Sequence, residues 1–167
     1  MSLTTTLKVQ IQADQKGSND LGTPGFPLNN TKTTQLASGT GSNQADLLFT
    51  DQRTLAASAT EDLDLAGSLT DALGATLNFV KVKAIMISAA AANTNNVEVT
   101  PGAANGFLGP FADASDQLDI PPGGRIYLEA PVSGWTVTAG TGDLLTITNS
   151  AGSTGVTYDV IIVGASA

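Results

Sequence analysis

The sequence predicts an all-β protein, either an antiparallel β-sandwich or a jelly-roll-like barrel, with an extended N-terminal arm. Short apolar segments recur about every ten residues between Gly, Pro, Asn and Ser clusters, and none has the period of an amphipathic helix. The chain has 167 residues, of which 41% are hydrophobic, which is enough for one packed core. We expect residues 1–55 to form an N-terminal strand, long loop and arm region, and residues 56–167 to form the sandwich core.

The first expected strand covers residues 5–13. Leu7, Val9 and Ile11 alternate there with Lys8, Gln10 and Gln12, which is typical of a strand with one apolar face. The arm is the part of the chain from which we expect contacts with a neighbouring molecule.

Residues 16–33 are rich in Gly, Pro and Asn and predict a long irregular loop. Loops of this length tend to be functional or to reach a neighbouring molecule. Phe26 is an apolar residue within the loop, and it either binds a neighbour or folds back onto its own core. The candidate interface residues of the arm are therefore Leu7, Val9, Ile11 and Phe26.

Residues 75–88 form the strongest expected strand, with apolar residues on both faces near its end, as in a buried central strand. Residues 68–74 suit a single helical turn that begins at Ser68 or Thr70 and ends at Gly74. The expected faces of the strong strand are Leu77 and Phe79 on one side, and Val80, Val82, Ala84 and Met86 on the other.

Turn signals separate the remaining short strands. Asn105-Gly106 favours a tight turn, and two prolines followed by two glycines favour another at residues 121–124. Further strands are expected at residues 45–50, 53–57, 61–66, 97–100, 118–120, 124–131, 135–139, 144–150 and 156–164.

Seven basic and fifteen acidic residues give a formal net charge of -8, and the basic residues are scattered. Nucleic-acid binding draws its affinity from clustered cations, so we expect no nucleic-acid partner. The N-terminus has no signal-peptide pattern, and the longest apolar run, residues 84–92, is too short to span a bilayer. We expect a soluble protein made in the host cytoplasm, with no membrane partner.

The chain has no histidine and no cysteine, which excludes Ser-His-Asp and Cys-His catalytic groups and the usual zinc sites. No phosphate-binding glycine loop followed by lysine is present. The sequence therefore predicts a protein that is not an enzyme and that has no cofactor.

Two groups of carboxylates leave alternatives open. Glu61, Asp62 and Asp64 form one group and Asp113, Asp116 and Asp119 form another. Either group could supply the paired acids of a glycosidase, although solvated loop and edge-strand residues explain them better. Asp113, Asp116 and Asp119 lie close together and could bind calcium through oxygen ligands, but their spacing does not match an EF-hand. Turns in which aspartate side chains bond to the local backbone are the preferred interpretation of this second group.

Several stretches resemble small virion structural proteins of tailed phages. These are residues 53–87, residues 93–107, Pro122-Gly123-Gly124 and residues 157–164. The resemblance covers the chain from about Gln44 to Gly164 and is carried by fold-related patterns, so no catalytic residue can be transferred from it.

The resemblance implies a capsid decoration or cement protein. Such a protein is a β-sandwich that forms a homotrimer or homodimer on the capsid surface of the virion. It binds the major capsid protein, and several modest contacts bridge and stabilise the capsomers. A tail, baseplate or receptor-binding component is the alternative.

Overall fold

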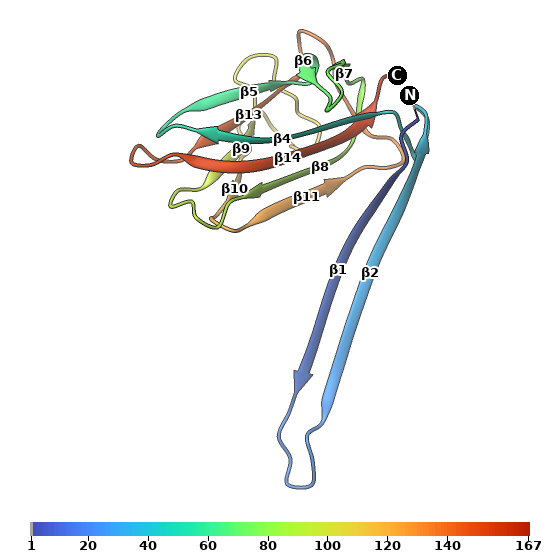
Figure 1. The fold of residues 1–167 in the computed structure, drawn as a ribbon, viewed down its shortest axis with the longest axis vertical. Coiled ribbons are helices and arrows are strands. Elements are labelled where there is room, and N and C mark those ends of the chain that lie inside the picture. Colours follow the sequence, from blue (N-terminus) through green and yellow to red (C-terminus); the bar gives the residue numbers. More distant parts are fainter. Residues whose placement is uncertain (1) are drawn as a thin grey trace.

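The computed structural model describes residues 2–167 and consists of strands joined by turns and loops. The all-β prediction is confirmed, with 57% of the chain in strands and several antiparallel sheets consistent with a β-sandwich. A long hairpin projects from this sandwich, and both chain ends lie near the root of that hairpin (Figure 1). Residues 2–167 contain no helix with the length and apolar character that crossing a membrane would require.

Two antiparallel sheets form the sandwich. The five-stranded sheet has the order β11-β8-β14-β4 with β12 added to β8, and the four-stranded sheet has the order β10-β9-β13-β5. The first sheet consists of β4 (Leu47–Leu55), β8 (Lys81–Ala89), β11 (Arg125–Glu129), β12 (Trp135–Thr136) and β14 (Val156–Ala165). The second consists of β5 (Thr60–Asp64), β9 (Val97–Pro101), β10 (Leu118–Ile120) and β13 (Leu144–Asn149).

The main core lies between these sheets and is made of Val, Ile, Leu and a few aromatic side chains. Residues that alternate along β13 and β14 supply its centre, since strand side chains point to opposite faces in turn. The fully buried members include Leu63, Ile87, Val97, Phe107, Ile147, Val160 and Ile162.

The predicted helical turn at residues 68–74 is wrong. This stretch is part of a small hairpin formed by β6 (Ala66–Thr70) and β7 (Thr76–Asn78). The Asp71 carboxylate accepts hydrogen bonds from the backbone N–H groups of Leu73 and Ala75, so it organises a tight turn in place of a helix. Leu69 and Leu77 point into the main core and fix the hairpin there.

The strand predicted over residues 75–88 is interrupted between Asn78, where β7 ends, and Lys81, where β8 begins. The side-chain faces expected for this strand are only partly right. In β8, Ala84 pairs with Val163 but Val82 pairs with Gly164, so Lys83 is an additional residue at a β-bulge. The bulge changes the side on which the following side chains lie. Val82 consequently packs in the main core, whereas Ala84 packs in a second cluster on the outer face.

The long loop predicted over residues 16–33 is also wrong, because most of it is a strand. β1 (Thr5–Lys16) pairs along its whole length with β2 (Gly25–Ser38), and only residues 17–24 form the connecting tip. Pro27 fits because one side of β2 has no neighbouring strand there. Pairing with β1 keeps this segment extended, although its own residues have low strand propensity.

We call this hairpin, residues 5–38, the arm, and residues 44–167 the body. The arm is shorter than the 1–55 region that the sequence suggested. β4 is the reason, because it pairs with β14 inside the five-stranded sheet. β3 (Gln44–Ala45) pairs in parallel with the end of β2 and connects the arm to the body.

A polar cluster joins the two sheets near their terminal strands β4 and β5. The Tyr158 hydroxyl of β14 donates a hydrogen bond of 2.7 Å to one Glu61 carboxylate oxygen of β5. The Arg53 guanidinium of β4 lies 2.6 Å from the other oxygen, and it also bonds Asp51 at 2.9 Å. The guanidinium carbon is 5.7 Å from the centre of the Phe49 ring. Charged groups are tolerated at this core margin because each has a partner.

Replacing Glu61 with Ala should reduce the free energy of unfolding by about 1–3 kcal/mol, because the fully buried Tyr158 hydroxyl loses its acceptor. Urea unfolding followed by tryptophan fluorescence measures this loss. Glu98→Ala, on a strand of the same sheet, is the matched control and should change stability much less. Equal effects of the two substitutions would contradict the role assigned to Glu61.

Stability should also fall in alkaline solution. Burial, followed by the hydrogen bond to Glu61, raises the pKa of the Tyr158 hydroxyl above its ordinary value of 10.0. The unfolded chain therefore loses this proton first, so the contribution of Tyr158 is complete below about pH 10 and is lost as the pH rises further. Urea midpoints measured from about pH 8 to pH 11 should fall less steeply for Tyr158→Phe than for the parent protein. Parallel curves would contradict this assignment.

Candidate interaction surface

The arm has one apolar face and one polar face. Residues directly opposite each other in the two strands share a face, and the pairing places Ala13 opposite Leu28 and Gln15 opposite Phe26. The apolar face carries a row of side chains beyond the body that we call the arm stripe: Val9, Ile11, Ala13, Phe26 and Leu28.

Polar side chains occupy the opposite face and are partly bonded to one another. Gln10 donates a hydrogen bond of 3.0 Å to Asn29, and Lys16 lies 3.3 Å from Asp14. This face is therefore suited to water, in contrast to the arm stripe. The division into two faces extends over the 12 residues of β1.

The arm stripe is not covered by any other part of the described chain. Ile11 is 62% exposed and Phe26 is 65% exposed, which is unusual for side chains of this size. At the tip of the arm, Leu21 is 99% exposed. A row of uncovered apolar residues on a projecting element is typical of a surface that binds a partner.

The root of the arm is fixed to the body by a second, smaller apolar cluster. Leu7 and Leu36 are 7% and 1% exposed and pack with Ala84 and Val163 on the outer face of the five-stranded sheet. Tyr127 borders the same cluster. The arm stripe begins where this cluster ends, so both belong to one continuous apolar surface.

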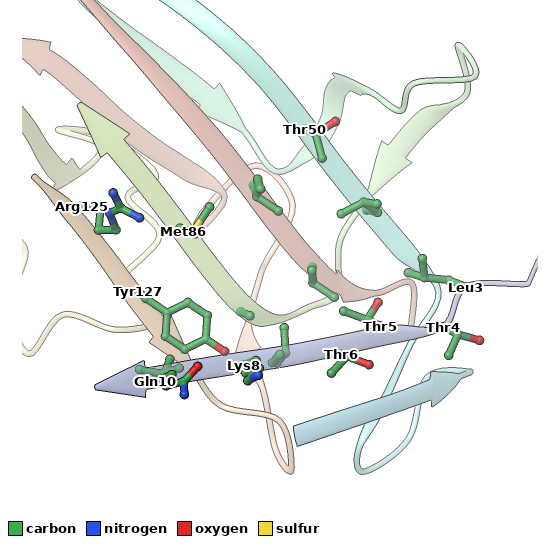
Figure 2. Close-up of a pocket in the computed structure, with 16 residues that line it drawn as sticks. Leu3, Thr4, Thr5, Thr6, Lys8, Gln10, Thr50, Met86, Arg125 and Tyr127 are labelled. Atoms are coloured by element: carbon green, nitrogen blue, oxygen red, sulfur yellow. The ribbon is translucent and has the colours of Figure 1, made fainter. Parts of the chain in front are cut away.

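A groove of about 770 Å³ lies between the root of β1 and the outer face of the five-stranded sheet. Tyr127 and Met86 of the sheet and Lys8 and Gln10 of β1 border the same hollow (Figure 2). Its charged lining residues are Lys8 and Arg125, both of them basic. The groove therefore combines an apolar floor with a positive rim.

Lys83 is a buried cation beneath the arm root. Its ammonium donates hydrogen bonds to the carbonyl oxygens of Gly41, at 3.2 Å, and Val132, at 3.0 Å. Burial, followed by the nearby charge of Lys81, lowers the pKa of Lys83. Gly41 belongs to the loop after β2 and Val132 to the loop after β11, so Lys83 ties the arm connection to the body.

Charge is divided unevenly between arm and body. Residues 1–43 contain three lysines and two aspartates, whereas residues 44–167 contain four basic and thirteen acidic residues. The body therefore has a formal net charge of -9, and residues 1–43 have one of +1. Two bodies repel each other, whereas the arm is nearly neutral and can approach another chain without that repulsion.

The carboxylates considered for catalysis do not gather into one site. Glu61 binds Arg53 and Tyr158. Asp62 accepts a hydrogen bond from Thr146, and Asp64 accepts one from the backbone N–H of Ala66. Each of these side chains thus has a structural partner.

The carboxylates considered for calcium are also engaged locally. Asp116 accepts hydrogen bonds from the backbone N–H groups of Ala112 and Asp113. Asp113 accepts bonds from the backbone and hydroxyl of Ser115, which lower its pKa, and Asp119 accepts one from Gln117. Residues 2–167 contain no group of acidic side chains arranged to hold a metal ion.

The candidate interface residues divide into two groups. Val9, Ile11 and Phe26 lie together on the exposed arm stripe, whereas Leu7 is buried against its own body and is not free to bind another chain. Phe26 does not fold back onto its own core. Leu28 and Leu21 were not among the candidates, although Leu28 shares the alternating positions of Phe26.

No protein-family model matches the chain, and no curated protein is similar to it. The arm, the groove and their charges are therefore the features that bear on function.

Replacing Lys83 with Met should loosen the arm root, because the loops at Gly41 and Val132 lose their shared donor. The backbone N–H of Asn43, which donates to the Pro131 carbonyl at 3.0 Å, should then exchange its hydrogen faster. Hydrogen exchange read by mass spectrometry checks this. Lys81→Met is the control, since the Lys81 ammonium donates to the Thr136 hydroxyl and not to the Gly41 or Val132 carbonyl. Unchanged exchange at Asn43 in Lys83→Met would contradict the tethering role.

Proposed function

We propose that this chain is a structural component of a tailed-phage virion that decorates the capsid and bridges its capsomers, and that it is not an enzyme. The observation that carries the proposal is the projecting arm with its uncovered arm stripe. A surface of this kind supports binding between chains, and an arm that is fixed to the body at its root suits a bridging role. The resemblance of residues 44–164 to virion proteins supports the same function.

The body contributes a stiff, acidic platform. Its two sheets are linked through the main core and through the Arg53–Glu61 ion pair, so forces on one sheet are transmitted to the other. Thirteen acidic residues give the body a field that can orient it toward a basic surface. The major capsid protein is the proposed partner for this body.

Bridging follows from multivalency. A chain that binds a capsomer weakly on its own gains attachment when a second copy is held nearby at high effective concentration. An arm that joins two copies would supply this advantage without a strong individual contact. The proposed partners are therefore the capsid and another copy of the chain.

The test is binding of the purified protein to expanded heads that lack decoration. Saturation should occur at a number of copies that matches the capsid symmetry axes, measured by gel densitometry and cryo-electron microscopy. A variant with residues 10–31 replaced by Asn-Gly joins the paired residues Val9 and Lys32 by a tight turn and leaves the arm root in place. This short-arm variant should fold but bind heads at least ~10-fold more weakly, because attachment becomes monovalent.

Absence of head binding by the parent protein would refute capsid decoration. Labelled protein found on tails of intact virions would place it in the tail or baseplate instead. Equal head binding by the parent and short-arm proteins would show that the arm takes no part in attachment.

A further inference from the structure

We infer that the arm stripe is covered by the arm of a second copy of this chain, packed face to face and antiparallel. In this arrangement the tip of each arm enters the groove at the root of the other. The inference concerns self-association and does not require that the capsid role be correct.

The first reason to infer a second arm on this face is that the arm stripe is uncovered. A two-stranded hairpin is at best marginally stable alone in water, and it gains stability when its apolar face packs on another layer. Beyond Leu7 and Leu36, nothing in the described chain packs on that face of the arm. Since the polar face needs no cover, a single additional layer completes the arm.

A second copy of the chain can supply this layer because the arm stripe is self-complementary. An interface related by a two-fold axis uses the same patch on both chains. Among the paired residues of the apolar face, Lys32 is the single charged one, and it lies near the root, opposite Val9. In the antiparallel arrangement Lys32 therefore lies toward the tip of the other arm, which carries Asp20. Two stripes can thus meet without opposed like charges.

Antiparallel packing also brings each tip to the groove. The apolar face of the arm points toward the outer face of the five-stranded sheet, as the packing of Leu7 against Ala84 requires. A second arm laid on this face therefore runs into the angle between the arm and the sheet, where the groove lies (Figure 2).

The chemistry of the tip matches that of the groove. Leu21, 99% exposed, offers an apolar side chain to a floor that includes Met86 and Tyr127. Asp20 is its neighbour and carries a negative charge toward a rim that contains Lys8 and Arg125. Opposite charges across an interface set its register as well as its partner.

The area suits a weak but specific dimer. Residues 9–16 of β1, which lie beyond the buried root, make a free face about 27 Å long at ~3.4 Å each, and two adjacent strands make it roughly 10 Å wide. Two such faces and two tips seated in grooves bury on the order of 1,000 Å², which is the size of a weak or transient interface. We therefore expect association at micromolar concentrations.

Light scattering after size-exclusion chromatography tests the association on the full chain. The parent protein should have twice the mass of one chain at about 100 µM and dissociate on dilution. Ile11→Asp places a charge in the arm stripe and should weaken association by ~100-fold, whereas Gln12→Asp on the polar face should leave it unchanged. Circular dichroism confirms that both variants fold.

Single cysteines test the packing, because the natural chain has none. With each tip at the root of the other arm, the residues nearest the two-fold axis lie about midway between Lys8 and the tip. Gln15 lies there on the apolar face, opposite Phe26, and Asp14 lies there on the polar face, opposite Pro27. A thiol cross-linker with a reach of about 10 Å, the spacing of packed sheets, should join Gln15→Cys chains and not Asp14→Cys chains. Equal cross-linking would indicate pairing along the strand edges and would overturn face-to-face packing.

Charge exchange tests the tip and the groove. Asp20→Arg and Arg125→Glu should each weaken association, and the double variant should restore it, because the pair is re-formed with reversed signs. A parent protein that stays a single chain, a mass of three chains, or failure of the double variant to recover would overturn the proposed dimer. Head binding is measured separately, so failure here leaves the capsid proposal open to its own test.

Discussion

The packing of Leu7 and Leu36 on the outer face of the five-stranded sheet is the constraint on which the arm depends. Burial of a leucine stabilises by about 1.5–3 kcal/mol relative to exposure, and these two are 7% and 1% exposed. Without them, the short pairing of β2 with β3 and the hydrogen bond from Lys83 to the Gly41 carbonyl would be the main restraints on the direction of the arm. The two leucines orient the arm, and they also determine that the arm stripe faces the sheet side of the molecule. The groove and the stripe then lie within one continuous apolar surface.

The β-bulge at Lys83 allows one strand to serve two cores. Val82 points into the main core and Ala84 into the cluster at the arm root, with Lys83 between them. Gly164 lies opposite the bulge, where a Cβ would collide with the Lys81 carbonyl and the Phe79 ring. The close approach of the backbones at this point permits the register to shift. The extra residue also directs the Lys83 ammonium to the two loop carbonyls that tie the arm connection to the body.

The distribution of polar groups supports a structural role for the molecule. The body holds its charges in defined pairs, as at Glu61, or in local turns, as at Asp113 and Asp116. The arm has one polar face and one face that carries the arm stripe together with Asn30 and Lys32. Stability within the chain and the proposed binding between chains thus depend on different parts of the molecule, so one can change with limited effect on the other.

The sequence by itself determined the all-β class, the positions of most body strands, the turns at Asn105 and Gly123, and the alternation of Val9 and Ile11. These features depend on the period of two and on turn residues, which are local properties. Strand β2 was missed because Pro27 and its asparagines have low strand propensity, and only pairing with β1 holds them extended. The bulge at Lys83 and the partners of Glu61 depend on residues distant in sequence. The sequence also predicted Val9, Ile11 and Phe26 as interface residues. Tertiary structure alone decided that these three stay exposed while Leu7, with the same alternation, is buried, because burial depends on where the arm meets the sheet.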